Sequence, residues 1–317
     1  MPVSAVPATK SSSPLVIGLG EALFDRFGDY AVLGGAPINF AVHAGQLLAE
    51  RGGQGAAVSR VGDDELGRCL QAELQARRIN LSGMQIDESA PTGVVEVTVD
   101  ADGQPAYDIR TGAAWDRLEF DAALADLAAR CDAVCFGTLA QRAPTSRAAI
   151  HAFLAAAPQA LRMCDLNLRP PHYDDAVIEA SLQAANAAKV NEEELELVAN
   201  LVGGAIAAGS GDDQVFALME HFHLTAAVVT RGARGTAVYR GGECFSAEPP
   251  PLARNPDADA VGAGDACAAA AACGLLFDWP LERIVTLANA AGGFVASQRG
   301  ATPQLPANLI AKVAEPR

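Results

Sequence analysis

The sequence predicts an α/β fold in which helices cover a mostly parallel β-sheet. Short runs rich in β-branched residues and bounded by glycine alternate along the chain with longer alanine-rich stretches, which is typical of repeated βαβ units. The chain has 317 residues, of which 50% are hydrophobic, so it is long enough to bury a sizeable core. We expect one domain over residues 15–317, preceded by a disordered polar tail at residues 1–14.

Individual strands and helices follow from this alternation. The short apolar runs predict buried strands at Val58–Val61, Ala133–Phe136, Arg162–Asp165 and Ala226–Thr230. The longer stretches predict helices at Pro37–Arg51, Glu65–Arg77, Thr145–Ala156 and Ala266–Leu276.

Two regions break the βαβ rhythm. One is residues 26–33; the other is the pair Thr92–Val99 and Gln104–Arg110, joined by Asp100-Ala101-Asp102-Gly103. The chemistry of that turn predicts a β-hairpin. We therefore expect lid segments at about 26–33 and 92–112, forming a small antiparallel sheet over the carboxyl edge of the large one, where open α/β sheets bind ligands.

Charge and composition exclude several classes of protein. The net charge of −15 argues against binding to nucleic acid or to an anionic membrane, since both need clustered Lys and Arg. None of the three lysines follows a glycine, so the phosphate loop of P-loop kinases is absent. Seven cysteines without a C-x-x-C pair fit a reducing cytoplasm better than a disulfide scaffold or zinc site. No apolar run is long enough to span a membrane.

The most informative segment is Asp259–Asp265, which runs directly into the predicted helix Ala266–Leu276. Glycines before a helix leave backbone N–H groups free at its positive end, which suits the charge that develops on a phosphoryl group during transfer. Asp265 then lies in the first helical turn, where it could accept the proton of an attacking hydroxyl. A helix cap is the alternative interpretation of the same residues.

A second glycine segment opens the helix near the amino terminus. Gly34 and Gly35 let a substrate approach the backbone closely, and Asn39 offers both a donor and an acceptor to sugar hydroxyls. Asp25, at the end of a strand, is a candidate polyol ligand, although strand-end carboxylates are often simply solvated.

Polar residues also follow two of the later strands. The alternation in Asp165-Leu166-Asn167-Leu168-Arg169 predicts that Asp165, Asn167 and Arg169 lie on one side of an extended strand. Asn191 and Glu194 supply an amide and a carboxylate one turn apart, which suits magnesium contact through water. Each motif alone is more often structural.

Two glycine-containing turns bear on nucleotide binding. Residues 18–23 resemble half of a dinucleotide fingerprint, but Leu23 occupies the place of the third glycine, which disfavours a nicotinamide cofactor. Thr230–Gly235 is a glycine-rich turn after a strand, which could admit a nucleotide.

Taken in order, these segments resemble the ribokinase-like (PfkB) carbohydrate kinase family from about Leu15 to Ala307. Residues 34–39, running into Arg60–Asp64 and Gly67, resemble the first family signature, and Asp259–Asp265 resembles the second. The resemblance implies a three-layer α/β/α fold with a mostly parallel central sheet and a small antiparallel β lid.

The resemblance also implies catalytic and sugar-binding residues. Asp265 would be the catalytic base, with an anion hole formed by Gly262, Ala263 and Gly264. The sugar contacts that it implies are Asp25, Gly34, Gly35 and Asn39, together with Arg110 from the lid, Asn167 and Arg169.

ATP and Mg²⁺ are the cofactors that the resemblance implies. ATP would lie against Thr230, Gly232 and Gly235, with Asn289 near the adenine. Asn191 and Glu194 would organise Mg²⁺ and phosphate, Glu194 through water, and the carbonyls of Asp259 and Val261 would bind a potassium-like cation. Two positions depart from the pattern: Ala260 replaces a common threonine and Cys267 a common phenylalanine.

Within the family the chain resembles fructokinases in particular, through Gly20-Glu21, Tyr107–Arg110 with Ala114–Asp116, and Asp165–Arg169. This implies phosphorylation of a ketohexose, D-fructose to fructose 6-phosphate. Ketodeoxygluconate kinase and ribokinase are alternatives, and a catalytically silent sugar sensor or a dehydrogenase are hypotheses from other classes. An exposed lid edge would favour a homodimer, since unpaired strands tend to pair with another chain.

Overall fold

The computed structural model describes residues 13–28, 30–99, 105–251, 255 and 258–315. The predicted tail at 1–14 therefore lies almost wholly outside the described residues, as does the turn at 100–103 of the predicted hairpin.

Within the described residues, nine strands form the large sheet, in the order β13-β12-β11-β10-β9-β8-β1-β4-β5. The strands are β1 (Leu15–Leu19), β4 (Gln54–Gly62), β5 (Asn80–Asp87), β8 (Ala133–Phe136), β9 (Leu161–Asp165), β10 (Ala187–Asn191), β11 (Ala226–Thr230), β12 (Thr236–Arg240) and β13 (Glu243–Ala247). Neighbours from β5 to β11 run parallel, whereas β12 and β13 add an antiparallel edge. The predicted mostly parallel sheet is confirmed.

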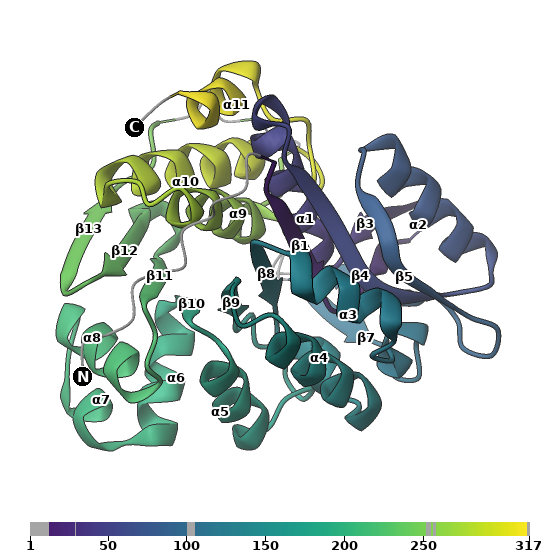
Figure 1. The fold of residues 1–317 in the computed structure, drawn as a ribbon, viewed down its shortest axis with the longest axis horizontal. Helices are drawn as coiled ribbons and strands as arrows, with labels where there is room; N and C mark the ends of the chain where they lie inside the picture. Colours follow the sequence, from purple (N-terminus) through teal and green to yellow (C-terminus); the bar gives the residue numbers. More distant parts are fainter. Residues whose placement is uncertain (1–12, 29, 100–104, 252–254, 256–257, 316–317) are drawn as a thin grey trace.

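Helices cover both faces of this sheet (Figure 1). One face packs against α1 (Ala36–Leu48), α9 (Ala263–Leu276), α10 (Leu281–Ala296) and α11 (Ala307–Ala314). The other packs against α3 (Ala122–Arg130), α4 (Pro144–Ala156), α5 (Asp175–Ala184), α6 (Glu192–Val202), α7 (Gly204–Ala208) and α8 (Asp212–His221). Helix α2 (Glu65–Ala76) packs in a smaller cluster with β4 and the second sheet. Successive strand residues such as Val16 and Ile17 pack in different hydrophobic clusters, one on each face of the sheet, as expected for a sheet buried on both faces.

A second sheet contains both predicted lid segments. Its strands are β3 (Tyr30–Gly34), β2 (Leu23–Phe27), β6 (Gly93–Val99) and β7 (Pro105–Ile109), in that order. The outer pairs β2–β3 and β6–β7 are antiparallel, as predicted, whereas the central pair β2–β6 is parallel.

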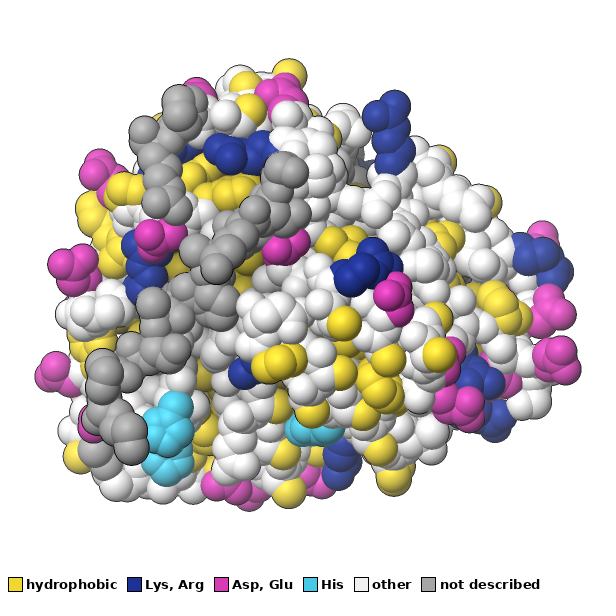
Figure 2. Space-filling view, viewed as in Figure 1, with side chains coloured by type: hydrophobic (Ala, Val, Ile, Leu, Met, Phe, Trp, Pro, Cys, Tyr) yellow, Lys and Arg dark blue, Asp and Glu magenta, His cyan; other side chains and the backbone are white. Residues whose placement is uncertain are grey.

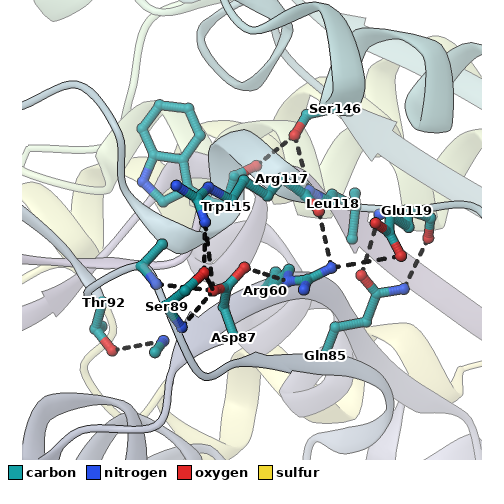
Figure 3. Close-up of polar contacts among 12 residues, drawn as sticks. Arg60, Gln85, Asp87, Ser89, Thr92, Trp115, Arg117, Leu118, Glu119 and Ser146 are labelled. Carbon is teal, nitrogen blue, oxygen red and sulfur yellow. Dashed lines mark hydrogen bonds and ion pairs between the residues drawn. The ribbon is translucent and has the colours of Figure 1, made fainter.

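The connection from the large sheet into the lid is fixed by a polar network around Asp87, at the end of β5 (Figure 3). Asp87 Oδ1 accepts hydrogen bonds from Ser89 N, Ser89 Oγ and Ala90 N. Arg60 of β4 lies 2.9 Å from Asp87 Oδ2, and Arg117 lies 3.7 Å from Oδ1. The network joins two large-sheet strands to the residues that lead into β6, so it sets the path of the lid.

One expectation about a strand is wrong. The alternating run from Asp165 to Arg169 predicts an extended strand, but β9 ends at Asp165. Asn167 then adopts a left-handed conformation with φ of 40°, which breaks the two-residue alternation. Asp165, Asn167 and Arg169 therefore do not share one strand face.

The surface is mixed in charge. On the face shown in Figure 2, basic and acidic side chains of the described residues lie interspersed. Among the helices described, none is both long and apolar enough to cross a membrane.

Candidate active site

The aspartate singled out by the sequence lies near the start of a helix that is buried from this residue onward. Asp265 is 9% exposed and sits in the first turn of α9, whose remaining residues to Leu276 are all buried. Small alanine side chains let this helix pack closely against α10 and the sheet. Gly262, the N-cap, has φ of 78°, and a Cβ there would lie 2.3 Å from the Ala301 carbonyl oxygen, so glycine is required.

The residues of the predicted anion hole, Gly262, Ala263 and Gly264, are the N-cap and the first two residues of α9. The N–H of Ala263 donates to Ala260 O within a turn. Gly262 has no side chain to cap the helix, so the first-turn amides of Gly264 and Asp265 retain the partial positive charge of a helix start.

The Asn39 side chain meets Asp265 across 226 residues of sequence. Asn39 Nδ2 donates to Asp265 Oδ2 at 2.8 Å, and both side chains are buried. Asn39 Oδ1 is buried and has no hydrogen-bond partner within the part of the chain that the structure describes. The asparagine predicted to bind sugar therefore also orients the predicted base, and its amide oxygen remains available as an acceptor.

Gly34 and Gly35 are required by close contacts. A Cβ on Gly34 would lie 2.3 Å from Asp25 Oδ2, and one on Gly35, where φ is 103°, would lie 2.4 Å from Glu21 O. The two glycines thus make room for the segment that carries Glu21 and Asp25.

A cavity of about 600 Å³ lies beneath the lid and contains most of the predicted sugar-binding side chains. We call it the Asp265 cavity. Its polar lining residues are Glu21, Asp25, Asn39, Asn167, Arg169, Lys189, Asp259 and Asp265. Its roof consists of lid residues from β2, β6 and β7, including Phe27, Val95 and Ile109.

Arg110 is not part of this lining. Its side chain is 63% exposed and lies 3.1 Å from Glu96 Oε1. The structure therefore places this lid arginine on the surface beside a carboxylate.

A second cavity of about 370 Å³, the Gly232 cavity, contains the residues predicted to hold a nucleotide. Thr230, Gly232, Gly235 and Asn289 all line it, together with apolar and small residues of α9 and α10. Asn289 Nδ2 donates to Ala247 O at 2.7 Å. Ala260 and Gly264 line both cavities, so the two meet beside Asp265.

Asn191 and Glu194 form a capping box at the start of α6. Asn191 Oδ1 accepts from Glu194 N at 2.8 Å, and Glu194 Oε2 accepts from Asn191 N at 2.9 Å. Glu194 Oε1 also accepts from Leu168 N at 2.9 Å, which ties α6 to the loop carrying Asn167 and Arg169. Neither residue lines the two cavities.

The predicted cation loop is held by its own backbone and by the segment after α10. Asp259 N donates to Gln298 O, Gly300 N donates to Asp259 Oδ2, and Val261 N donates to Asp259 Oδ1. Among the described residues, no group of three or more His, Cys, Asp or Glu side chains could hold a metal ion.

A buried ion pair that the sequence analysis missed lies at the floor of the Asp265 cavity. Lys189 Nζ, on β10, lies 2.9 Å from Asp165 Oδ1. Burial raises the pKa of Asp165 to about 6, although Lys189 opposes this. Burial would lower the pKa of Lys189, but Asp165 and Glu194 raise it overall. A lysine inside the apolar run Ala187–Val190 was the available signal.

Glu21 was also missed as a site residue. It follows β1 and is 3% exposed, and its Oε2 is buried with no hydrogen-bond partner among the residues described. Burial raises its pKa to about 7, with a further contribution from Asp265, while Arg169 opposes the rise. An acidic residue between two apolar strands was the signal in the sequence.

Asp25 shares this environment. Burial raises its pKa to about 6; Arg169 lowers it, and the charges of Asp265 and Asp259 raise it further. The charges of the carboxyl groups around the cavity therefore shift one another's pKa values.

Comparison with known proteins gives a family for this arrangement. Residues 31–308 match the model of the "pfkB family carbohydrate kinase". Fructokinase-1 of Oryza sativa is 29% identical over 328 residues, covering 94% of this chain and 96% of that protein. Probable fructokinase-4 of Arabidopsis thaliana is 28% identical over 304 residues, covering 90% and 88%.

Solved structures resemble the whole fold. A fructokinase with bound ATP from Xylella fastidiosa matches with a TM-score of 0.78 at 21% identity, covering 96% of this chain and 99% of that chain. A putative ribokinase II from E. coli, in complex with ATP and Mg²⁺, matches with 0.76 at 19% identity and the same coverage. These likenesses confirm the predicted three-layer α/β/α fold with its small lid.

The matched region spans most of the chain, from the lid strand β3 to the start of α11, and includes Asp265, the lining of the Gly232 cavity and most of the lining of the Asp265 cavity. The chain therefore belongs to the pfkB family of carbohydrate kinases, which are phosphotransferases that act on a sugar hydroxyl.

Proposed function

We propose that this chain transfers the γ-phosphoryl group of ATP to a hydroxyl of a ketohexose, specifically converting D-fructose to fructose 6-phosphate. The observation that carries the proposal is the meeting of two cavities at Ala260 and Gly264, beside Asp265. One cavity is rich in carboxylate, amide and guanidinium groups, which bind hydroxyls. The other is lined by small and apolar residues around a glycine turn, which suits a nucleotide base and ribose.

The choice of fructose rests on the relatives. Curated relatives covering about nine tenths of the chain are named fructokinases, and one structural neighbour, from Vibrio cholerae, is described in a form with fructose, ADP and calcium bound. In the proposed assignment, Asp25, Asn167 and Arg169 contact the sugar. Arg110, which the resemblance also implies, would have to leave Glu96 to reach it.

Asp265 acts as the base in the proposed mechanism. It accepts the proton of the sugar hydroxyl while that oxygen forms a bond to the γ-phosphorus of ATP. The bond from the γ-phosphorus to the bridging oxygen breaks, and ADP leaves. Asn39 holds the Asp265 carboxylate through its 2.8 Å hydrogen bond, and the first-turn amides of α9 stabilise the charge on the phosphoryl oxygens.

The residues present fit a magnesium ion held mainly by phosphate and water. Magnesium keeps several of its waters and uses few protein ligands, which agrees with the lack of an acidic metal cluster among the described residues. Because Glu194 and Asn191 line neither cavity and are held in their capping box, Glu194 would contact such an ion only through water. When bound, Mg²⁺ neutralises charge on the phosphates. Asp259 and Val261 would supply carbonyls to a potassium-like cation.

The test is an ADP-release assay with fructose, ribose, 2-keto-3-deoxygluconate and adenosine as acceptors. We expect fructose to give the highest kcat/KM. Replacing Asp265 with Asn should lower kcat by about 10² to 10⁴ while fructose binding stays measurable by calorimetry. Full activity of the Asp265→Asn variant would overturn the role of the base, and no ADP release with any sugar would favour a silent sensor.

We also propose that the chain forms a homodimer through its lid. Among the described residues, the outer strands of the small sheet, β3 and β7, each have one unpaired edge, and Tyr30 of β3 is 46% exposed. Unpaired strand edges favour pairing with another chain. Light scattering should give twice the chain mass, and a monomer mass at micromolar concentration would contradict the proposal.

A further inference from the structure

A third cavity lies apart from the two that meet at Asp265. It has a volume of about 520 Å³ and shares no lining residue with either of them. Its walls come from η2 (Ala114–Arg117), the first turns of α4 and α5, and the loops that precede them. We call it the Arg147 cavity, and its polar lining residues are Thr111, Asp116, Arg117, Arg142, Arg147, His172, Tyr173 and Asp174.

Arginine side chains outnumber acidic ones in this lining. Arg142 and Asp116 form a buried ion pair, in which Nε and Nη2 each donate to one carboxylate oxygen at 2.9 Å. Asp174 is the N-cap of α5, where its side chain accepts a backbone N–H. With the buried pair set aside, Arg117 and Arg147 stand against one carboxyl group that already has a partner. The cavity is therefore a local region of positive charge in a chain whose net charge is −15.

The guanidinium groups of Arg117 and Arg147 retain N–H groups for a ligand. Arg147 Nε donates to Gln141 O at 2.8 Å, and its two terminal nitrogens have no hydrogen-bond partner among the described residues. Arg117 Nη1 donates to Ser89 Oγ at 2.6 Å and lies 3.7 Å from Asp87 Oδ1, whereas its Nη2 has no partner in the same part of the chain. Two such guanidinium groups on one cavity suit an anion that can accept hydrogen bonds from both.

A phosphate monoester matches these two arginines better than a carboxylate does. It carries close to two negative charges at neutral pH and three acceptor oxygens, so it can accept from Arg117 and Arg147 at the same time. A carboxylate has one charge and two oxygens, so a single arginine satisfies it. The backbone adds to this preference, since no side chain caps the start of α4 at Ala143 and the free N–H groups there carry partial positive charge.

The rest of the lining suits the hydroxyl groups of a sugar. Burial and the charge of Arg142 lower the pKa of His172, although two nearby carboxylates oppose this, so the ring is neutral at neutral pH and can both donate and accept. Hydroxyl groups of Thr111 and Tyr173 lie in the same lining. The volume of the cavity is also within the range of small-molecule sites.

Two hydrogen bonds connect this cavity to the lining of the Asp265 cavity. His172 N donates to Arg169 O at 2.8 Å, and Arg142 Nη1 donates to Ile109 O at 3.4 Å. Arg169 and Ile109 both line the Asp265 cavity. A ligand that holds the loop carrying His172 therefore steadies the wall that carries Arg169.

We propose that the Arg147 cavity binds the phosphate monoester of a small sugar and is an effector site beside the acceptor site. Arg117 and Arg147 hold the phosphate, and His172, Thr111 and Tyr173 contact the sugar hydroxyls. The coupling to acceptor binding rests on the proposed function, whereas the binding site does not.

Calorimetry with D-glucose 6-phosphate tests the site. Fructose and a non-hydrolysable ATP analogue are present in excess, so that the Asp265 and Gly232 cavities are filled. We expect a Kd of about 1 mM or tighter, and binding at least about tenfold weaker for gluconate, a sugar acid without a phosphate group. No binding of glucose 6-phosphate, or equal binding of gluconate, would overturn the proposal.

Variants assign the binding to this cavity. Arg147→Gln should weaken glucose 6-phosphate binding by about tenfold or more, and Arg147→Lys, which keeps the charge, should restore part of the affinity. Arg130→Gln removes the same charge from the exposed surface of α3, where Arg130 pairs with Asp126, and should leave the affinity unchanged. Thermal melts check that each variant is folded; if Arg147→Gln is not, Arg117→Gln removes the other guanidinium and carries the same expectation. A folded variant with wild-type affinity would overturn the assignment.

The effector role has a readout of its own. Saturating glucose 6-phosphate should tighten fructose binding by about threefold or more in the wild type and have no such effect in Arg147→Gln. An unchanged fructose affinity in the wild type would overturn the effector role. If fructose does not bind at all, the proposed function fails, while the dependence of glucose 6-phosphate binding on Arg147 still decides the site.

Discussion

Lys189 shows how much one buried side chain can matter in this protein. It is the counter-ion of Asp165 and lines the Asp265 cavity. A Cβ placed on Gly264 would lie only 3.3 Å from its Nζ, so the ammonium lies next to the start of α9. Its net effect is to neutralise a carboxylate that would otherwise stand uncompensated below the site.

Replacing Lys189 with Met should therefore be costly. Removing one partner of a buried ion pair leaves an unpaired charge and typically costs about 3–5 kcal/mol. Urea unfolding should show this loss in Lys189→Met and a partial recovery in the double variant Lys189→Met/Asp165→Leu, which removes both charges. A single variant as stable as the wild type would show that Asp165 finds another partner.

Glu21 makes a prediction about stability that needs no substrate. Its pKa is about 7 in the folded protein against an ordinary value of 4.5, so between these pH values the folded state binds more protons than the unfolded state. Stability then falls as pH rises through this window. Glu21→Gln lacks the group and should be more stable than the wild type at about pH 8, by roughly 1–3 kcal/mol. Thermal melts should show the difference shrinking toward pH 5; a constant difference would contradict the assignment.

At the scale of elements, the Asp87 network decides where the lid begins. Burial would raise the pKa of Asp87, but hydrogen bonds from Ser89 and Ala90 and the charge of Arg60 lower it to about 2. The group therefore contributes stability that is present above its ordinary value of 3.8 and is lost as pH falls toward 2.

Asp87→Asn should remove this acid-sensitive contribution. We expect the variant to be less stable than the wild type at neutral pH by about 1–3 kcal/mol, with the gap closing as pH falls below about 4. Asp126→Asn is a suitable control, because Asp126 pairs with Arg130 on an exposed helix surface, where such pairs contribute a few tenths of a kcal/mol. Acid titration followed by circular dichroism measures both variants.

Some elements were predictable from local sequence and others were not. The helix starting near Asp265, the helix after Gly35 and the β6–β7 pairing all follow from glycine placement and turn chemistry close in sequence. The parallel pairing of β2 with β6, by contrast, joins segments about 70 residues apart, and no local pattern encodes it. The alternation of polar and apolar residues predicted a strand that continues through Asn167, but the positive φ of that residue breaks the strand there.

The same limit applies to the site. Residue type and position in the sequence predicted three parts of the candidate site: Asp265, Asn39 and the glycine turn at Gly232. Lys189 and Glu21 were missed because their importance comes from burial and from the strands beside them, which the order of strands in the large sheet determines. Polar residues inside apolar runs are therefore candidates for functional groups.

At the scale of the whole molecule, the proposed function depends on how the lid, the large sheet and helix α9 meet around the two cavities. The lid supplies the apolar roof of the Asp265 cavity, β10 of the large sheet supplies Lys189, and the starts of α1 and α9 supply Asn39 and Asp265. Helix α9 also separates the two cavities, so a single helix start faces both partners of the proposed reaction.

The shared wall at Gly264 has a use in inhibitor design. Because Gly264 lines both cavities and has no side chain to close the passage, a bisubstrate compound could occupy both at once through a short tether between a ketose and an adenine nucleotide. Linking two weak ligands at high effective concentration raises affinity by about 10² to 10⁴. A bulky residue at that position, Gly264→Val, would close the passage and abolish the gain.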